Sequence, residues 1–210
     1  MNSPLRPSAS SAVNSGASQP LEPASRRAIF IDRDGTLILD KDYLHKPDEV
    51  QFIEGAIAAL KRASDAGFVI IMVTNQSGIG RGYFTLADVE TVHAHIIKKL
   101  AAQNVSFLEI YIAPEAPDAP SRGRKPSPQF LFDARDAHEI DLARSYIIGD
   151  KLIHLECGWN AGVRKSIRVR TGYGANVETS EKEKLHNAIV VDDICAAVNW
   201  ILANAGRGRA

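Results

Sequence analysis

Ala-Ile-Phe-Ile-Asp-Arg-Asp-Gly-Thr, residues 28–36, is the stretch that decides the fold. Its first four residues are apolar and two of them are β-branched, which predicts a short buried strand. The strand runs into Asp32, Arg33, Asp34 and the turn-forming Gly35. Because side chains two positions apart in an extended chain point the same way, Asp32 and Asp34 can face one site while Arg33 points elsewhere. Converging acids are tolerated mainly where they share a cation or a proton, but a strand that simply ends in a polar turn has the same pattern.

The composition is that of a chain with balanced charge. Its 210 residues include 25 Lys plus Arg and 25 Asp plus Glu, so the formal net charge is +0 at pH 7. Such neutrality argues against nucleic acid or a membrane surface as the main partner. The longest apolar run, residues 68–73, is too short to cross a bilayer. We expect a soluble, cytoplasmic monomer in which Cys157 and Cys195 are reduced, packed thiols.

The chain divides into a tail, one domain and a short end. Residues 1–25 are rich in Ser, Pro and Ala with almost no large apolar side chains, which predicts a disordered tail; organelle transit peptides share such a start. Residues 26–205, about 180 residues, are enough for one domain with a substantial core. Residues 206–210 are expected to be a frayed end.

Apolar periodicity predicts strands and helices that alternate along this domain. The expected strands are residues 28–31, 68–73, 107–112, 145–148, 166–170 and 189–191. The first expected helix spans residues 55–66, and the second begins at a capping box formed by Thr85 and Asp88. A third begins after Ser127, and a fourth ends at Ala161. The last begins after Asp192 or Asp193. This rhythm predicts an α/β fold, a Rossmann-like three-layer sandwich with a mainly parallel sheet.

Polar residues follow several of the predicted strands. Asp32, Asp34, Thr74, Lys125 and Asp150 all fall at or near the carboxyl edge of the sheet, where ligands bind in such folds. The glycine-dense loop at residues 74–82 is more typical of a loop that binds a phosphate or hydroxyl group than of a plain connector between a strand and a helix. Lys125 precedes a helix N-terminus, which would make an anion site, although a solvated basic loop would also place a lysine there. Cleavage of a phosphate ester needs a metal, a nucleophile, a proton donor and cationic or hydroxyl donors, and these residue types supply them.

In this order the motifs resemble the haloacid-dehalogenase-like phosphohydrolase superfamily. They are Asp-Arg-Asp-Gly-Thr at 32–36, Thr74, Lys125 and Gly-Asp at 149–150. Within the superfamily the sequence is similar to the D-glycero-D-manno-heptose 1,7-bisphosphate 7-phosphatase family. That similarity is carried by Asp-x-x-Tyr at 40–43, Thr-Asn-Gln-Ser-Gly-Ile-x-Arg-Gly at 74–82, Arg-Lys-Pro at 124–126 and Gly-Asp-Lys-Leu at 149–152.

The resemblance implies a Mg²⁺-dependent phosphatase that acts on a phosphosugar through an aspartyl-phosphate. Asp32 would attack phosphorus, Asp34 would move protons, and Thr74 and Lys125 would hold the transferring group. Asp32, the backbone carbonyl of Asp34, and Asp150 would bind Mg²⁺. The residues expected to contact the substrate are Asp40, Tyr43, Asn75, Gln76, Ser77, Arg81, Arg124 and Lys151. No large insertion separates the motifs, so no large cap domain is expected and loops must provide specificity.

The sequence departs from the family pattern at two places. The family often binds a structural zinc through Cys and His before Arg-Lys-Pro, but residues 112–123 contain neither, so we expect no zinc. The fourth motif normally carries a second acid four residues after the first, and here that position is His154. Two alternatives to the heptose assignment stay open. One is a phosphatase of histidinol phosphate, the nearest relative, or of another small phosphomonoester. The other, suggested by these departures, is a phosphosugar-binding protein with weakened catalysis.

Overall fold

The computed structural model describes residues 25–174, 182–185 and 187–206, and it contains a parallel sheet of six strands in the order β3-β2-β1-β4-β5-β6. The strands are β1 (Arg27–Ile31), β2 (Phe68–Asn75), β3 (Phe107–Ala113), β4 (Tyr146–Gly149), β5 (Lys165–Val169) and β6 (Ile189–Val191). The α-helices are α1 (Ala56–Asp65), α2 (Ser77–Gly80), α3 (Leu86–Ala101), α4 (Gln129–His138), α5 (Leu152–Ala161) and α7 (Ile194–Asn204). Short 3-10 turns cover Pro47–Glu49, Leu142–Arg144 and Lys182–Leu185.

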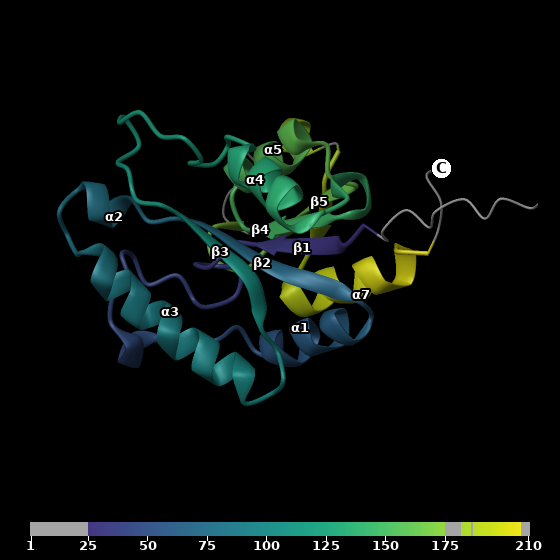
Figure 1. Ribbon diagram of the computed structural model, residues 1–210, viewed down its shortest axis with the longest axis horizontal. Helices are drawn as coiled ribbons and strands as arrows, with labels where there is room; N and C mark the ends of the chain where they lie inside the picture. Colours follow the sequence, from purple (N-terminus) through teal and green to yellow (C-terminus); the bar gives the residue numbers. More distant parts are fainter. Residues whose placement is uncertain (1–24, 175–181, 186, 207–210) are drawn as a thin grey trace, which may run out of the picture.

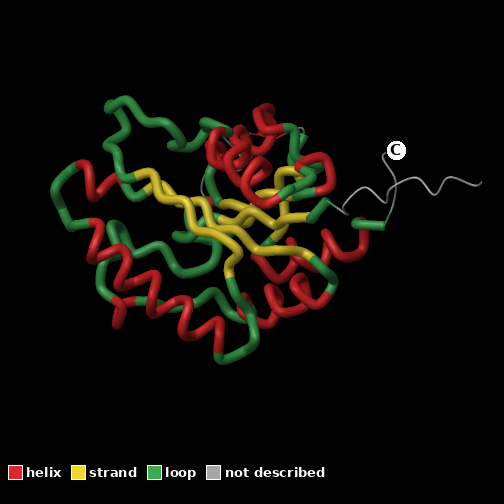
Figure 2. The backbone as a smooth tube through the Cα atoms, in the orientation of Figure 1, coloured by secondary structure: helices red, strands yellow, loops and turns green. Residues whose placement is uncertain are grey.

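The sheet is the middle layer of a three-layer sandwich, with α1, α3 and α7 on one face and α4 and α5 on the other (Figure 1). The side chains of the central strand β1 explain why both faces of the sheet are covered, because successive side chains of a strand point to opposite faces. Ile29 and Ile31 enter the core beneath α1, α3 and α7, whereas Ala28 and Phe30 enter the core beneath α4 and α5. Figure 2 shows the strands enclosed between helices on both sides. The predicted α/β class is confirmed.

The order of the strands determines which motifs become neighbours. Strand β1 lies between β2 and β4, with Ile29 opposite Ile70 on one side and Tyr146 on the other. The chain leaves β1 toward β2 and β3 and later returns on the other side with β4, which makes the end of β1 the switch point where parallel sheets bind ligands. The backbone of Asp32 extends this pairing, because its N–H donates to the carbonyl of Ile148 at 3.1 Å.

Most predicted elements are present, with bounds that shift by about one residue, and the exceptions have local causes. The loop predicted at residues 74–82 is wrong in part: Thr74 and Asn75 continue β2 because they pair with Ile112 and Ala113 of β3, and the next residues form the short helix α2. Helix α4 begins after Pro128 instead of being capped directly by Ser127, whose Oγ accepts a hydrogen bond of 3.3 Å from the N–H of Gln129.

The expected tail at residues 1–25 lies outside the described residues except for Ser25, and the expected end at 206–210 lies outside them except for Gly206. Cys157 and Cys195 are free cysteines; the first is buried and the second is half-buried. None of the helices formed by the described residues has the length and apolar character needed to cross a membrane.

Candidate active site

Asp32 and Lys125 form a buried ion pair at the end of β1. Lys125 Nζ lies 2.5 Å from Asp32 Oδ1 and also donates to the Val73 carbonyl at the end of β2. Both side chains are nearly inaccessible to solvent, so the carboxylate has been taken out of water and placed against one cation. Asn75 holds the lysine backbone: its Oδ1 accepts from the Lys125 N–H at 3.1 Å and its Nδ2 donates to the Lys125 carbonyl at 3.2 Å.

Asp34 is held by a second polar network. Gln76 Nε2 donates to Asp34 Oδ2 at 3.0 Å and to Thr74 Oγ1 at 2.7 Å. Arg33 Nε donates to both oxygens of Asp34, and Arg33 Nη2 donates to Gln76 Oε1 at 3.1 Å and to the Leu44 carbonyl. The expectation that Arg33 points elsewhere is therefore wrong. Its long side chain is buried and folds back onto the neighbouring acid, which strand periodicity does not predict.

Asp150, at the end of β4, faces Asp32 and the ring of His154. The N–H of Tyr173 donates to Asp150 Oδ2 at 3.0 Å, whereas Asp150 Oδ1 has no hydrogen-bond partner. Burial, and then the charge of Asp32, raise the pKa of Asp150 to about 7. One ligand atom from each of Asp32, Asp150 and His154 lies within 4.8 Å of the other two, so these three residues could hold a metal ion.

Two glycines leave the space that Asp150 occupies. A Cβ on Gly35 would lie 2.5 Å from Asp150 Oδ2, and a Cβ on Gly172 would lie 2.4 Å from the same atom. Both glycines also have positive φ, +75° at Gly35 and +60° at Gly172. Thr171 Oγ1 joins the two turns by donating to the Gly35 carbonyl at 2.6 Å. The turn after β1 and the turn after β5 are thus packed together around the buried carboxylate.

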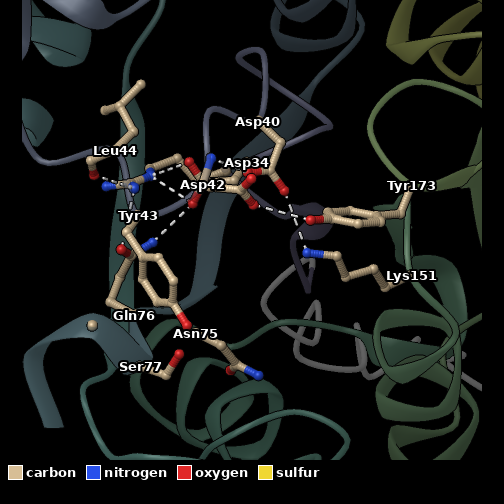
Figure 3. Close-up of a pocket in the computed structure, with 12 residues that line it drawn as sticks. Asp34, Asp40, Asp42, Tyr43, Leu44, Asn75, Gln76, Ser77, Lys151 and Tyr173 are labelled. Atoms are coloured by element: carbon tan, nitrogen blue, oxygen red, sulfur yellow. Dashed lines mark hydrogen bonds and ion pairs between the residues drawn. The ribbon is translucent and has the colours of Figure 1, made fainter. Parts of the chain in front are cut away.

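A polar pocket of about 210 Å³ opens beside this centre (Figure 3). It is lined by Arg33, Asp34, Asp40, Asp42, Tyr43, Leu44, Asn75, Gln76, Ser77, Gly78, Lys151 and Tyr173. The pocket therefore combines the loop after β1, the end of β2 with α2, and the loops after β4 and β5. Figure 3 shows Tyr43, Asn75 and Ser77 on one side and Lys151 and Tyr173 on the other.

Lys151 and Tyr173 connect the two loops that border the pocket. Lys151 Nζ lies 3.4 Å from Asp40 Oδ2 and 4.3 Å from the centre of the Tyr173 ring, and the Tyr173 hydroxyl donates to Asp42 Oδ1 at 3.0 Å. Burial raises the pKa of Asp40 in spite of the lysine. Burial acts to lower the pKa of Lys151, but Asp150, Asp40 and Asp32 together raise it. Lys151 therefore lies among carboxylates that stabilise its charged form.

The structure places the predicted substrate residues in two groups. Asp40, Tyr43, Asn75, Gln76, Ser77 and Lys151 line the pocket. Arg81 and Arg124 do not line it; Arg81 is exposed just beyond α2, and Arg124 Nη1 donates to the Glu115 carbonyl at 3.1 Å in the loop after β3. The roles assigned to the residues of both groups stay predictions.

Residues that the sequence did not single out also belong to the site. Strand alternation points Arg33 away from the two acids, and its burial depends on the later segments that carry Leu44 and Gln76. Tyr173 follows β5 in the motif Thr-Gly-Tyr-Gly, which the sequence marks only as a loop. The position of Tyr173 after a parallel strand, next to two glycines, is the signal that could have found it.

Comparison with known proteins gives consistent results. The family model described as "Polynucleotide kinase 3 phosphatase" matches residues 27–172. The D-glycero-beta-D-manno-heptose-1,7-bisphosphate 7-phosphatase of Escherichia coli strain K12 is 41% identical over 152 residues, which are 69% of this chain and 80% of that protein. The D-glycero-D-manno-heptose-1,7-bisphosphate 7-phosphatase of Chlorobaculum tepidum is 37% identical over 198 residues, covering 88% and 98%. A crystal structure of D,D-heptose 1,7-bisphosphate phosphatase from B. bronchiseptica, complexed with magnesium and phosphate, superposes with a TM-score of 0.78 at 30% identity, covering 85% of this chain and 99% of that one.

Proposed function

Because the chain belongs to the haloacid-dehalogenase-like phosphohydrolase superfamily, in the family of the heptose-1,7-bisphosphate 7-phosphatases, we propose that it hydrolyses D-glycero-D-manno-heptose 1,7-bisphosphate at the 7-phosphate. The observation that carries the proposal is the buried Asp32, which is paired with Lys125 and faces Asp150 across a possible cation site. A carboxylate that is held in place and kept from bulk water is suited to nucleophilic attack on phosphorus.

The proposed reaction has two steps. In the first, a carboxylate oxygen of Asp32 bonds to phosphorus, the bond between phosphorus and the sugar oxygen breaks, and Asp34 gives its proton to that oxygen. In the second, Asp34 takes a proton from water, whose oxygen bonds to phosphorus and releases Asp32 and orthophosphate. Gln76 and Arg33 orient Asp34 for both transfers. We expect Lys125 and Thr74 to donate hydrogen bonds to the phosphoryl oxygens.

The residues present fit Mg²⁺. Asp150 Oδ1 is a buried carboxylate oxygen without a hydrogen-bond partner, and the charge of Asp32 acts on Asp150 from nearby. Asp32, Asp150 and the carbonyl of Asp34 would hold the ion, which when bound would offset the charge of the phosphoryl group. We propose no zinc in residues 112–123, where Ser121 Oγ donates to Glu115 Oε2 at 2.7 Å and accepts from the Arg124 N–H at 3.1 Å. These hydrogen bonds hold the loop.

The pocket favours a small polar substrate over a nucleic acid. Its volume of about 210 Å³ and its mainly polar lining suit one small polar molecule. Tyr43 and Tyr173 offer exposed aromatic faces and Ser77 offers a hydroxyl, which are groups suited to a sugar. We propose that the substrate is not a polynucleotide. The monomeric state and the cytoplasmic location stay predictions.

Phosphate release from a substrate panel tests the proposal. The panel contains both anomers of the heptose bisphosphate, fructose 1,6-bisphosphate, histidinol phosphate and a 3′-phosphorylated oligonucleotide, each with Mg²⁺ and with a chelator. We expect kcat/KM to be highest for one heptose anomer and activity to be lost with the chelator. Preference for histidinol phosphate or the oligonucleotide would reject the heptose assignment. Binding of the heptose bisphosphate without release would identify a binding protein.

Asp32→Asn tests the nucleophile in the same assay. An amide is a very poor nucleophile toward phosphorus, so we expect turnover to fall below detection while far-UV circular dichroism stays unchanged. Asp65→Asn is the matched control, because Asp65 is an exposed acid at the end of α1, where it pairs with Lys61. It should retain full activity. Turnover by Asp32→Asn well above background would exclude Asp32 as the only nucleophile.

A further inference from the structure

We propose that a ring nitrogen of His154 is a ligand of the divalent cation held by Asp32 and Asp150, and that this ligand shifts the preference of the site away from Mg²⁺ toward Mn²⁺ and Co²⁺. The inference rests on the proposed function only in assuming that a cation binds between these two acids. It concerns the one position of the fourth motif at which the chain departs from the family pattern.

Each of the two acids has one oxygen held by the protein and directs the other toward His154. Asp32 Oδ1 accepts from Lys125, and Asp32 Oδ2 lies 3.8 Å from His154 Nε2. Asp150 Oδ2 accepts from the N–H of Tyr173, and Asp150 Oδ1 lies 3.6 Å from His154 Nδ1. The imidazole thus lies against the oxygens that the rest of the site leaves for a ligand.

His154 is buried and its position is well defined. The side chain is 4% exposed, and both His154 Nδ1 and Asp150 Oδ1 are buried without a hydrogen-bond partner. A Cβ on Gly149 would lie only 2.2 Å from His154 Nδ1, so the glycine leaves the space into which the ring packs. Two unpartnered polar atoms in so small a buried volume are costly unless something binds both, and a metal ion does so.

The spacing suits one ion. In six-coordinate geometry with bonds of about 2.1 Å, neighbouring ligand atoms lie about 3 Å apart and opposite ones about 4.2 Å apart. His154 Nδ1 lies 3.6 Å from Asp150 Oδ1, and the other ring nitrogen, Nε2, lies 3.8 Å from Asp32 Oδ2. One ligand atom from each of the three residues lies within 4.8 Å of the other two, which is slightly wider than the spacing around a bound ion. Small shifts of the side chains would therefore bring one nitrogen and two oxygens onto a common centre.

The exchange of an acid for an imidazole changes which metal such a centre prefers. Mg²⁺ prefers oxygen ligands and water, whereas imidazole binds transition metals well and its affinity rises along the series from Mn²⁺ to Co²⁺ and beyond. The imidazole also brings no negative charge, which removes part of the attraction that an acid would offer to Mg²⁺. Both effects lower the affinity for Mg²⁺ relative to that for Co²⁺.

Electron spin echo envelope modulation of the Mn²⁺-loaded full chain tests the ligand directly, without an activity assay. We expect a nitrogen-14 coupling typical of a bound imidazole, replaced by a nitrogen-15 pattern when the protein is made with ¹⁵N-histidine. The coupling should vanish in His154→Asp and persist in His95→Gln, which changes a half-buried histidine on α3 away from the site. Absence of the coupling in the wild type, or of Mn²⁺ binding itself, would overturn the inference.

Calorimetric titration with Mg²⁺ and with Co²⁺ tests the selectivity. His154→Asp should lower the ratio of Co²⁺ affinity to Mg²⁺ affinity by about tenfold or more, the range found when residues around a metal are changed. His154→Gln, which keeps a neutral side chain, should lower the affinity for Co²⁺ without raising the affinity for Mg²⁺. An unchanged ratio in His154→Asp would reject the inference. If His154→Asp fails to fold, the isotope-labelled wild type alone decides.

The outcomes separate this inference from the proposed function. Phosphate release with Mg²⁺ and no nitrogen coupling would leave the phosphatase assignment intact and reject the role of His154. A nitrogen coupling without phosphate release from any member of the panel would support the metal ligand and reject the phosphatase.

Discussion

At the scale of single residues, the proposed phosphoryl contact of Lys125 depends on Asn75. The amide of Asn75 makes two hydrogen bonds to the Lys125 backbone, at 3.1 and 3.2 Å, so it determines where the lysine enters the site. We expect Asn75→Ala to lower kcat by about tenfold to a hundredfold, because displacement of a catalytic group by an ångström has effects of this size. Steady-state phosphate release is the measurement.

Asn160→Ala is the control for Asn75→Ala. Asn160 Nδ2 donates to the carbonyl of Pro126, next to the lysine, but the residue is exposed and makes a single bond of 3.2 Å there. We expect its kcat to match that of the wild type. Equal losses in both variants would show that the segment is merely sensitive to change, and no loss in Asn75→Ala would show that the lysine is held by other contacts.

His93 makes the stability of the fold depend on pH. His93 lies on the buried face of α3, with its Nε2 3.5 Å from Arg33 Nη1. Burial, and then the charge of Arg33, lower the pKa to about 4 from the ordinary 6.5, with Asp34 opposing. As the pH falls below 6.5, His93 becomes protonated in the unfolded chain but stays neutral in the folded chain. The free energy of unfolding therefore declines until about pH 4. The full loss is about 3 kcal/mol.

Urea unfolding between pH 7 and pH 4 measures this dependence. We expect His93→Gln to lose less stability over the interval than the wild type, by about 3 kcal/mol in the limit of the full shift. The control is His95→Gln, on the same helix, which should keep the slope of the wild type. Parallel slopes for the wild type and His93→Gln would contradict a buried neutral ring.

At the scale of elements, helix α3 owes its start to a capping box. Asp88 N–H donates to Thr85 Oγ1 at 3.2 Å, and Asp88 Oδ2 accepts from the Thr85 N–H at 2.8 Å. Thr85→Ala should lower the free energy of unfolding by about 1 kcal/mol, the usual cost of losing an N-cap, and urea unfolding measures it. Thr91→Ala removes a hydroxyl from the middle of the same helix, where it bonds the Ala87 carbonyl, and should be neutral or slightly stabilising. Equal losses in the two variants would contradict the capping role.

The same helix shows why some bounds follow from sequence and others do not. The capping box is a contact between neighbours in the chain, so Thr85 and Asp88 predict it without tertiary information, as the structure confirms. The end of β2 is different, because Thr74 and Asn75 become strand residues only by pairing with β3, far along the chain. Sequence patterns locate elements that local contacts define, and they misplace ends that distant pairing extends.

At the scale of the whole molecule, the monomeric state is a prediction that a mass measurement tests. Among the described residues the exposed large hydrophobic side chains are Tyr43, Tyr83, Leu86, Ile97 and Tyr173. Two of these tyrosines line the pocket, and Tyr83 packs edge-on against Tyr43. Light scattering after size exclusion should give the chain mass of 22.8 kDa. A mass near twice that value, unchanged on dilution, would contradict the monomer.

The sequence by itself determined the α/β class, the alternation of strands and helices with a parallel sheet, and five polar positions at one edge of that sheet. These follow from periodicity and from the rule that parallel strands end on the same side. Tertiary structure alone decided which of those residues touch. It paired Asp32 with Lys125, buried Arg33 against Asp34, and brought His154 next to Asp32. Such contacts join residues that are distant in the chain or depend on how a long side chain folds back, and burial then sets their charge; neither is encoded in local pattern.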